Sequence, residues 1–281
     1  LETVLALRAS GFALLHRPET TGPGLVDVLV GDVREVAGLA DIPLPRRPPD
    51  AEEPDPDAPE IPRPRPAPRH EVLAVIPYRQ IRERGFACVD DGAPLLAMTV
   101  TGQQTVPVAE VLARIPDVPI AVSDGCFDVA DEEYAEIVRR VIKEAIGEGE
   151  GSNFVIKRSF VTSISDYSLR SALAFFRRLI EVESGAYWVF IVHTGARTFV
   201  GATPERHVTL RDGVVTMNPI SGTYRYPPSG PTLPELMGFL ADPKESDELY
   251  MVLDEELKMM TRICRPGVRV TGPRLKEMAR L

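Results

Sequence analysis

A short region of the sequence, between residues 205 and 248, combines residue types that could carry out chemistry. Glu205 ends a Gly-Ala-Thr-Pro-Glu loop, a Ser-Gly-Thr loop occupies 221–223, and Glu245 and Glu248 are spaced i, i+3. Carboxylates can transfer protons or bind a divalent cation, and glycine lets the backbone approach a ligand closely. We therefore expect the functional site in this region.

The spacing of Glu245 and Glu248 allows two interpretations. Both residues begin a predicted helix over 244–264, where residues three apart share one face. Acidic residues in a first turn commonly complement the helix dipole. Two carboxylates on one face are also half of a magnesium site, which takes one or two carboxylates together with waters and substrate oxygens. Spacing alone favours the dipole interpretation.

The elements that must position these residues are read from apolar periodicity. Strands are predicted at 12–15, 26–30, 72–76, 95–100, 153–160 and 187–192, and amphipathic helices at 131–146, 168–182 and 244–264. Asp212-Gly213 is a strong hairpin signal. Hairpins with segregated helices indicate an α+β fold of mostly antiparallel sheet rather than a doubly wound fold.

The glycine-rich loop at 147–151 also has two interpretations. It could be a phosphate-binding loop, but it lacks the GxxxxGK[ST] pattern and carries two acidic residues. A glycine C-cap that ends the helix over 131–146 and leads into a strand fits the sequence better.

Composition narrows the class of protein. The net charge of the 281 residues is −9, without a basic patch interleaved with aromatics, so nucleic acid binding is not expected. The sequence contains no run of about 18 apolar residues, so no membrane span is predicted, and no secretory signal is visible. The three cysteines are far apart and form no CxxC motif, which fits a reducing cytoplasm and argues against structural zinc.

A proline-rich segment interrupts the N-terminal half. Residues 43–68 contain 11 prolines, which exclude a helix or a central strand. We expect an extended surface insertion over 43–69, with its 46–68 portion solvent-exposed; a partner-binding proline motif is the alternative. Residues 1–42 then supply N-terminal strands, and 70–281 form the main domain.

Three ordered motifs resemble one known family. Residues 201–205 (Gly-Ala-Thr-Pro-Glu), 219–223 (Pro-Ile-Ser-Gly-Thr) and 242–249 (Asp-Pro-Lys-Glu-x-x-Glu-Leu) resemble the chorismate-utilising enzymes, which include anthranilate synthase component I. The segments that are similar to the branch making 2-amino-2-deoxyisochorismate for phenazine synthesis are 76–80, 153–160, 218–228 and 247–252. The resemblance extends over nearly the whole chain outside the proline-rich segment.

The resemblance implies a role for each loop residue. Glu205 matches the acid that protonates the departing C4 hydroxyl of chorismate, and a desolvated carboxylic acid is suited to that donation. Gly222 and Thr223 match the loop that binds substrate through backbone and hydroxyl donors, and Ser221 belongs to the same loop.

The resemblance also changes the interpretation of the helix start. Glu248 matches a Mg²⁺ ligand, and Glu245 matches its neighbour beside the metal-bound carboxylate of the substrate. In this context the metal role is preferred to the dipole role.

Asn153 is an informative departure within the family. Members that add water place a lysine at this strand position as general base, whereas an amide cannot take a proton at neutral pH. Ammonia has a free lone pair and needs no such base. Asn153 therefore favours amination over hydroxylation.

The function implied is Mg²⁺-dependent amination of chorismate at C2, with ammonia from a glutamine amidotransferase domain or subunit. We expect an α+β fold whose antiparallel sheets form a central sandwich with helices outside, in a cytoplasmic homodimer. Anthranilate synthase, which also eliminates pyruvate, and a non-catalytic binding module are the alternatives. The family's other magnesium glutamate, catalytic histidine and further substrate contacts have no counterpart here, so we expect the 281 residues to cover only the N-terminal part of such a synthase.

Overall fold

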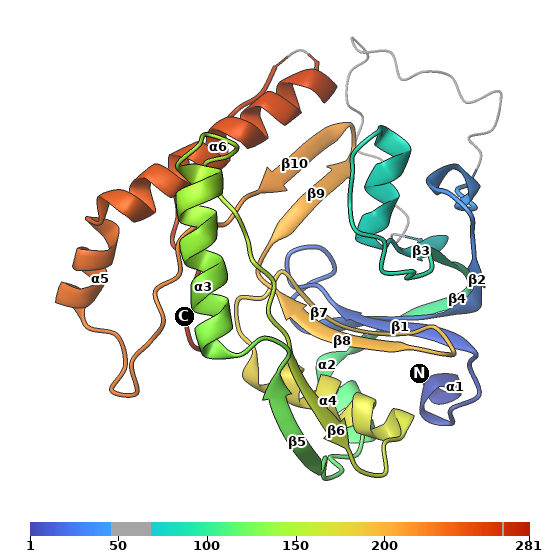
Figure 1. Cartoon of the computed structure of the whole chain (residues 1–281). Helices are drawn as coiled ribbons and strands as arrows, with labels where there is room; N and C mark the ends of the chain where they lie inside the picture. The colour runs from blue at the N-terminus through green and yellow to red at the C-terminus, as the bar shows by residue number, and fades with distance from the viewer. Residues whose placement is uncertain (46–68, 266) are drawn as a thin grey trace. The chain divides into compact units, whose positions relative to one another are not determined.

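Residues 1–45, 69–265 and 267–281 are described by a computed structural model (Figure 1). The helices are α1 (Glu2–Leu5), α2 (Val108–Arg114), α3 (Asp131–Arg140), α4 (Leu169–Val182), α5 (Leu233–Leu240) and α6 (Pro243–Ile263). The strands are β1 (Gly11–His16), β2 (Leu25–Glu35), β3 (Val72–Val75), β4 (Leu96–Pro107), β5 (Val122–Phe127), β6 (Phe160–Ile164), β7 (Trp188–His193), β8 (Thr198–Thr203), β9 (Arg206–Arg211) and β10 (Val214–Asn218). All strand pairs are antiparallel, which confirms the predicted α+β class.

The described chain divides into two compact units, each considered by itself below. The first unit comprises Leu1–Asp117, Ala172–Val182 and Tyr187–Thr203, and the second comprises Val118–Ser171, Glu183–Ala186 and Pro204–Leu281. Every candidate site residue belongs to the second unit.

The first unit is built on a six-stranded sheet with the strand order β3-β4-β2-β1-β7-β8 (Figure 1). A bulge in β4 at Thr101 shifts its register against β2 between Val30 and Gly31 and favours local bending of the sheet. The sheet is apolar on both faces at its centre: Phe12 and Leu14 are fully buried on one face, and Ala13 and Leu15 are buried on the other. Continuous apolar runs such as 12–15 are therefore consistent with the predicted buried strands.

The second unit consists of two separate hairpin-like strand pairs with helices α3, α5 and α6. β9 and β10 join through Asp212 and Gly213, which have φ values of 52° and 77°, so the predicted Asp-Gly hairpin is confirmed. β5 pairs with β6 over a longer connection. The packing of sheets into a central sandwich remains a prediction.

The predicted strand over 153–160 is wrong for most of its length. Only Phe160 lies in a strand, the first residue of β6, and 153–159 has irregular backbone. A strand needs a neighbour for its backbone groups, and no described strand pairs with 153–159. Side chains bind this backbone instead: the Tyr134 hydroxyl donates to the Ile156 carbonyl at 3.2 Å, and the Ser159 amide donates to Asp128 at 2.8 Å.

The predicted helix over 131–146 is confirmed in extent, but its last part, Val141–Ile146, is a π-helical segment. The glycine that follows, Gly147, is right-handed with φ −64°, and the left-handed conformation occurs at Gly149 with φ 80°. The prediction for the proline-rich segment falls on residues 46–68, which lie outside the described residues. No helix in the described ranges is long and apolar enough to cross a membrane.

Candidate functional site

The first turn of α6 presents the two candidate metal ligands. Asp242 caps the helix, because its carboxylate accepts a hydrogen bond from the Lys244 amide at 2.9 Å, and Pro243 occupies the first helical position. With the helix start fixed in this way, Glu245 and Glu248 lie on one face. The local sequence therefore explains both the predicted helix and the position of Glu245 and Glu248 on one of its faces.

A lysine side chain joins the two carboxylates. Lys244 Nζ lies 2.8 Å from Glu245 Oε1 and 3.0 Å from Glu248 Oε2. Hydrogen bonds to Glu245 and then Glu248 raise the pKa of Lys244. The hydrogen bond from Lys244 lowers the pKa of Glu248, against the opposing effect of burial. Lys244 and Glu248 are therefore both charged at neutral pH.

The Ser-Gly-Thr loop packs directly against this turn. Gly222 has φ 72°, and a Cβ atom at this position would lie 2.7 Å from Glu245 Oε2 and 3.1 Å from Phe239 Cζ. The close approach and the left-handed backbone together require glycine. Thr223 is exposed, whereas Ser221 and Gly222 are half-buried, so Thr223 is the loop residue most open to solvent.

Two polar atoms at this contact are buried without a hydrogen-bond partner among the described residues, Glu245 Oε2 and Ser221 Oγ. Ser221 also contributes to lowering the pKa of Glu248, although its hydroxyl forms no hydrogen bond of normal geometry. The dipole of the Ser221 hydroxyl group therefore stabilises the charged form of Glu248 without a formed hydrogen bond between the two side chains. Buried, unsatisfied oxygens are costly and commonly mark a place where a ligand or ion binds.

Asn153 and Glu248 line the same cavity. This cavity in the second unit has a volume of about 560 Å³, within the range of about 300–1,000 Å³ usual for small-molecule sites. One wall is apolar and comes mainly from α3 and the π-helical segment, including Tyr134, Val138, Val141 and Ile142. The polar wall is formed by Asn153, Lys244, Asp247 and Glu248.

Glu205 lies in a different part of the second unit. It is exposed, between β8 and β9, and its charge acts on Glu256 of α6. Burial raises the pKa of Glu256, His207 lowers it and Glu205 raises it further. Glu256 Oε2 is buried without a hydrogen-bond partner in the described part of the chain. The desolvation expected for the site acid is therefore found at its neighbour, Glu256.

The residues present fit part of a Mg²⁺ site. In the ranges that the structure describes, no group of three or more His, Cys, Asp or Glu is placed to hold a metal ion. Magnesium commonly needs only one or two protein carboxylates, the rest of its shell being water and substrate oxygens. Glu245, with an unsatisfied buried oxygen, and the ionised Glu248 satisfy that smaller requirement.

Two residues at the site were not predicted from the sequence. Lys244 could have been found from its i, i+4 spacing to Glu248, which commonly allows an ion pair on a helix. Glu256 lies 11 residues after Glu245, about three helical turns, and so falls near the same face of α6.

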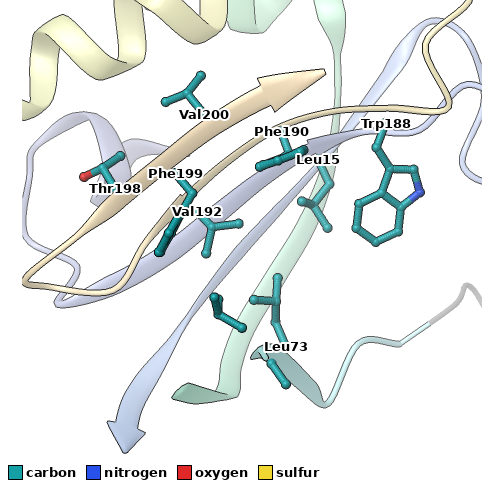
Figure 2. Close-up of a pocket in the computed structure, with 10 residues that line it drawn as sticks. Leu15, Leu73, Trp188, Phe190, Val192, Thr198, Phe199 and Val200 are labelled. Atoms are coloured by element: carbon teal, nitrogen blue, oxygen red, sulfur yellow. The ribbon is translucent and has the colours of Figure 1, made fainter. Parts of the chain in front are cut away.

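The first unit contains a second cavity, also of about 560 Å³, which is mainly apolar. Side chains of β1, β3, β7 and β8 gather around it, among them Leu15, Leu73, Phe190 and Phe199 (Figure 2). None of the described residues that line it is charged, so it offers no acid, base or metal ligand. We do not place the chemistry there.

Comparison with known proteins agrees with the motif analysis. The family of chorismate binding enzymes matches residues 104–280, which include every candidate site residue. The chain is 58% identical over 281 residues to a phenazine-specific anthranilate synthase of Pseudomonas chlororaphis and 57% identical over 281 residues to one of Pseudomonas fluorescens. Both matches cover 100% of this chain and 42% of the relative. An anthranilate synthase component 1 of Thermococcus kodakarensis is 34% identical over 149 residues, which are 51% of this chain and 32% of the relative.

Proposed function

Because the chain belongs to the chorismate binding enzyme family, we propose that it is part of a synthase that aminates chorismate at C2 with loss of the C4 hydroxyl. The product would be 2-amino-2-deoxyisochorismate, which keeps its enolpyruvyl group and serves a phenazine-type pathway. The observation that carries the proposal is the contact of the Ser-Gly-Thr loop with the carboxylate pair of α6, beside a cavity that Asn153 also lines.

In this proposal Glu248 and Glu245 would hold Mg²⁺, which when bound would neutralise and orient a carboxylate of chorismate. Gly222 allows the loop to lie against Glu245, so that Ser221 and Thr223 can donate hydrogen bonds to the substrate. The loop and the helix start thus bind and orient an anionic ring.

Glu205 would donate a proton to the departing C4 oxygen, so that water leaves while ammonia bonds to C2. Glu256 lies near enough to Glu205 for the two charges to interact, and burial raises the pKa of Glu256, so a second carboxyl group that favours its protonated form stands beside the proposed acid. The reaction consumes chorismate and ammonia and releases water, so no oxidant or reductant is required.

Asn153 supports amination as the first step. Its amide lines the cavity beside Glu248 but cannot act as a general base, so water would not be activated there. Ammonia would come from a glutamine amidotransferase domain or subunit.

Anthranilate synthase is the second candidate, because the relatives from Pseudomonas chlororaphis and Thermococcus kodakarensis carry that name. It would perform the same amination and then eliminate pyruvate. The two candidates differ in whether the product keeps the enolpyruvyl group.

The chain spans 42% of the length of the two Pseudomonas relatives, so the proposal concerns the complete protein. We propose that 1–42 and 70–281 contribute to one synthase domain, interrupted by an insertion over 43–69. In the complete domain antiparallel sheets would form a central sandwich with helices outside. We further propose a cytoplasmic homodimer.

The test is product analysis with the full-length protein, chorismate, an ammonium salt and Mg²⁺. Chromatography with mass detection should show a product in which NH₂ replaces OH and the enolpyruvyl group remains. Release of pyruvate with anthranilate would support the second candidate, and isochorismate as the main product would contradict both.

A further inference from the structure

Lys244 lies between the two carboxylates that we propose as metal ligands. We propose that Lys244 is a resident counter-ion of the Glu245–Glu248 pair, which Mg²⁺ must displace, so that metal binding is an exchange of one cation for another. This inference rests on the proposed function, because it concerns the same carboxylates. It assigns Lys244 a role in setting metal affinity.

The first argument is geometric. The ammonium group of Lys244 contacts one oxygen of each carboxylate, at 2.8 Å for Glu245 and 3.0 Å for Glu248. A single cation therefore already holds the two like charges together. A divalent ion that binds both carboxylates would be repelled by that ammonium group for as long as Lys244 stays in contact with the pair.

The second argument is that Lys244 leaves the pair incompletely satisfied. Glu245 Oε2 remains buried without a hydrogen-bond partner among the described residues, because the Gly222 backbone covers it and Lys244 contacts only the other oxygen. Ser221 Oγ is also buried without a partner. Glu245 Oε2 and Ser221 Oγ are therefore available as metal ligands, because Lys244 contacts neither of them.

A second lysine on the same helix shows that this is not simply a surface ion pair. Lys258 Nζ lies 2.8 Å from Asp254 and 2.7 Å from Glu255, but the side chains of these two acids are each 64% exposed. Glu245 and Glu248 are only 21% and 30% exposed. The Lys244 arrangement is therefore similar in contacts but lies at a partly covered site.

Displacement of Lys244 would disturb little of the fold. Its side chain is 68% exposed and carries the ammonium on a flexible stem of methylene groups, so the ammonium can move into solvent. Without metal, the ammonium offsets the repulsion between the carboxylates. When the metal is bound, the positive charges of the Lys244 ammonium and of the ion repel each other, which favours movement of the ammonium into solvent.

The experiment measures Mg²⁺ affinity by calorimetry in the full-length protein, with Mn²⁺ binding by electron paramagnetic resonance as a second readout. Lys244→Met should lower the dissociation constant by about three- to tenfold, the size expected from removing two partly exposed ion pairs. Lys244→Gln should act in the same direction. Lys258→Met is the matched control: it makes the same change in net charge on the same helix and should alter affinity by less than about twofold.

Two outcomes would overturn the exchange: unchanged or weaker Mg²⁺ binding in both Lys244 variants, or an equal gain in Lys258→Met. Glu248→Gln separates this inference from the proposed function, because it should weaken Mg²⁺ binding whatever Lys244 does. If Glu248→Gln weakens binding and the Lys244 variants do not strengthen it, only the exchange fails. If Glu248→Gln has no effect, the ion binds elsewhere and the proposed metal site fails as well.

Discussion

Gly222→Ala is the substitution that most directly tests how the loop and α6 are held together. Gly222 has φ 72°, a conformation that costs an L-residue about 1–2 kcal/mol. The added methyl group would also lie 2.7 Å from Glu245 Oε2 and 3.1 Å from the Phe239 ring, so one of these neighbours must move. Overpacking of this kind costs about 1–3 kcal/mol.

The expected loss in free energy of unfolding is therefore about 2–5 kcal/mol. Urea unfolding followed by circular dichroism measures it, and Mg²⁺ calorimetry on the folded variant should show weaker binding because Glu245 is displaced. Gly213→Ala provides the control. Gly213 has a similar φ of 77° but no atom within 4 Å of its added Cβ, so only the conformational cost of about 1–2 kcal/mol should appear. Equal losses in the two variants, with unchanged Mg²⁺ affinity in Gly222→Ala, would refute the role of this contact in holding Glu245, the proposed metal ligand.

Three further predictions concern the acid, the nucleophile and the first unit. Glu205→Gln in the full-length protein should lower kcat by about 10²–10⁴-fold with little change in chorismate affinity, as steady-state kinetics and calorimetry can show; a loss of affinity alone would contradict the acid role. Asn153→Lys should weaken amination and allow some isochorismate to form, and an unchanged amine product on chromatography would mean that residue 153 does not face the reaction. In the first unit, burial raises the pKa of Asp27, but hydrogen bonds from Thr21 and Arg17 outweigh this and hold it below the usual value for an aspartate. Asp27 therefore adds stability that is fully present above the pKa of an unfolded aspartate, about 4, and is lost as the pH falls through its lower folded pKa; thermal melts of Asp27→Asn should lack this acid-dependent part.

The start of α6 was predictable from sequence because its determinants are local. Asp242 and Pro243 define the cap, and an apolar stripe every three or four residues defines one apolar face of the helix. The Asp212-Gly213 turn was predictable for the same reason, since two adjacent residues favour positive φ.

The irregular segment 153–159 was not predictable, because its outcome depends on distant partners. Phe154, Val155 and Ile156 have the composition of a strand, yet no described strand pairs with them, and Val155 is 95% exposed. Strand formation depends on cross-strand neighbours more than on intrinsic preference. The likeness of 153–160 to family members could therefore be recognised without its local structure being known.

Contacts within the candidate site were only partly predictable. Motif resemblance gave the residue types at Gly222 and Glu245, but not the contact between them, which joins positions 23 residues apart through a left-handed glycine. The proximity of Glu205 to Glu256 likewise depends on tertiary packing, and no local pattern in 201–205 indicates it.

Helix α6 links these observations, because it carries both the carboxylate pair and the partner of the proposed acid. Glu248 and Glu256 are eight residues apart, which corresponds to about 12 Å along a helix axis. Glutamate side chains extend several ångströms, so the proposed substrate, a small ring that bears two carboxylate groups, would lie between the Glu248 end and the Glu205 end of this span. A rigid helix keeps that separation fixed, whereas two independent loops would not. The distance from the proposed metal ligand Glu248 to Glu256, the neighbour of the proposed acid, is therefore set by one element, and substitutions that bend α6 between residues 249 and 255 should impair catalysis without removing any proposed reacting group.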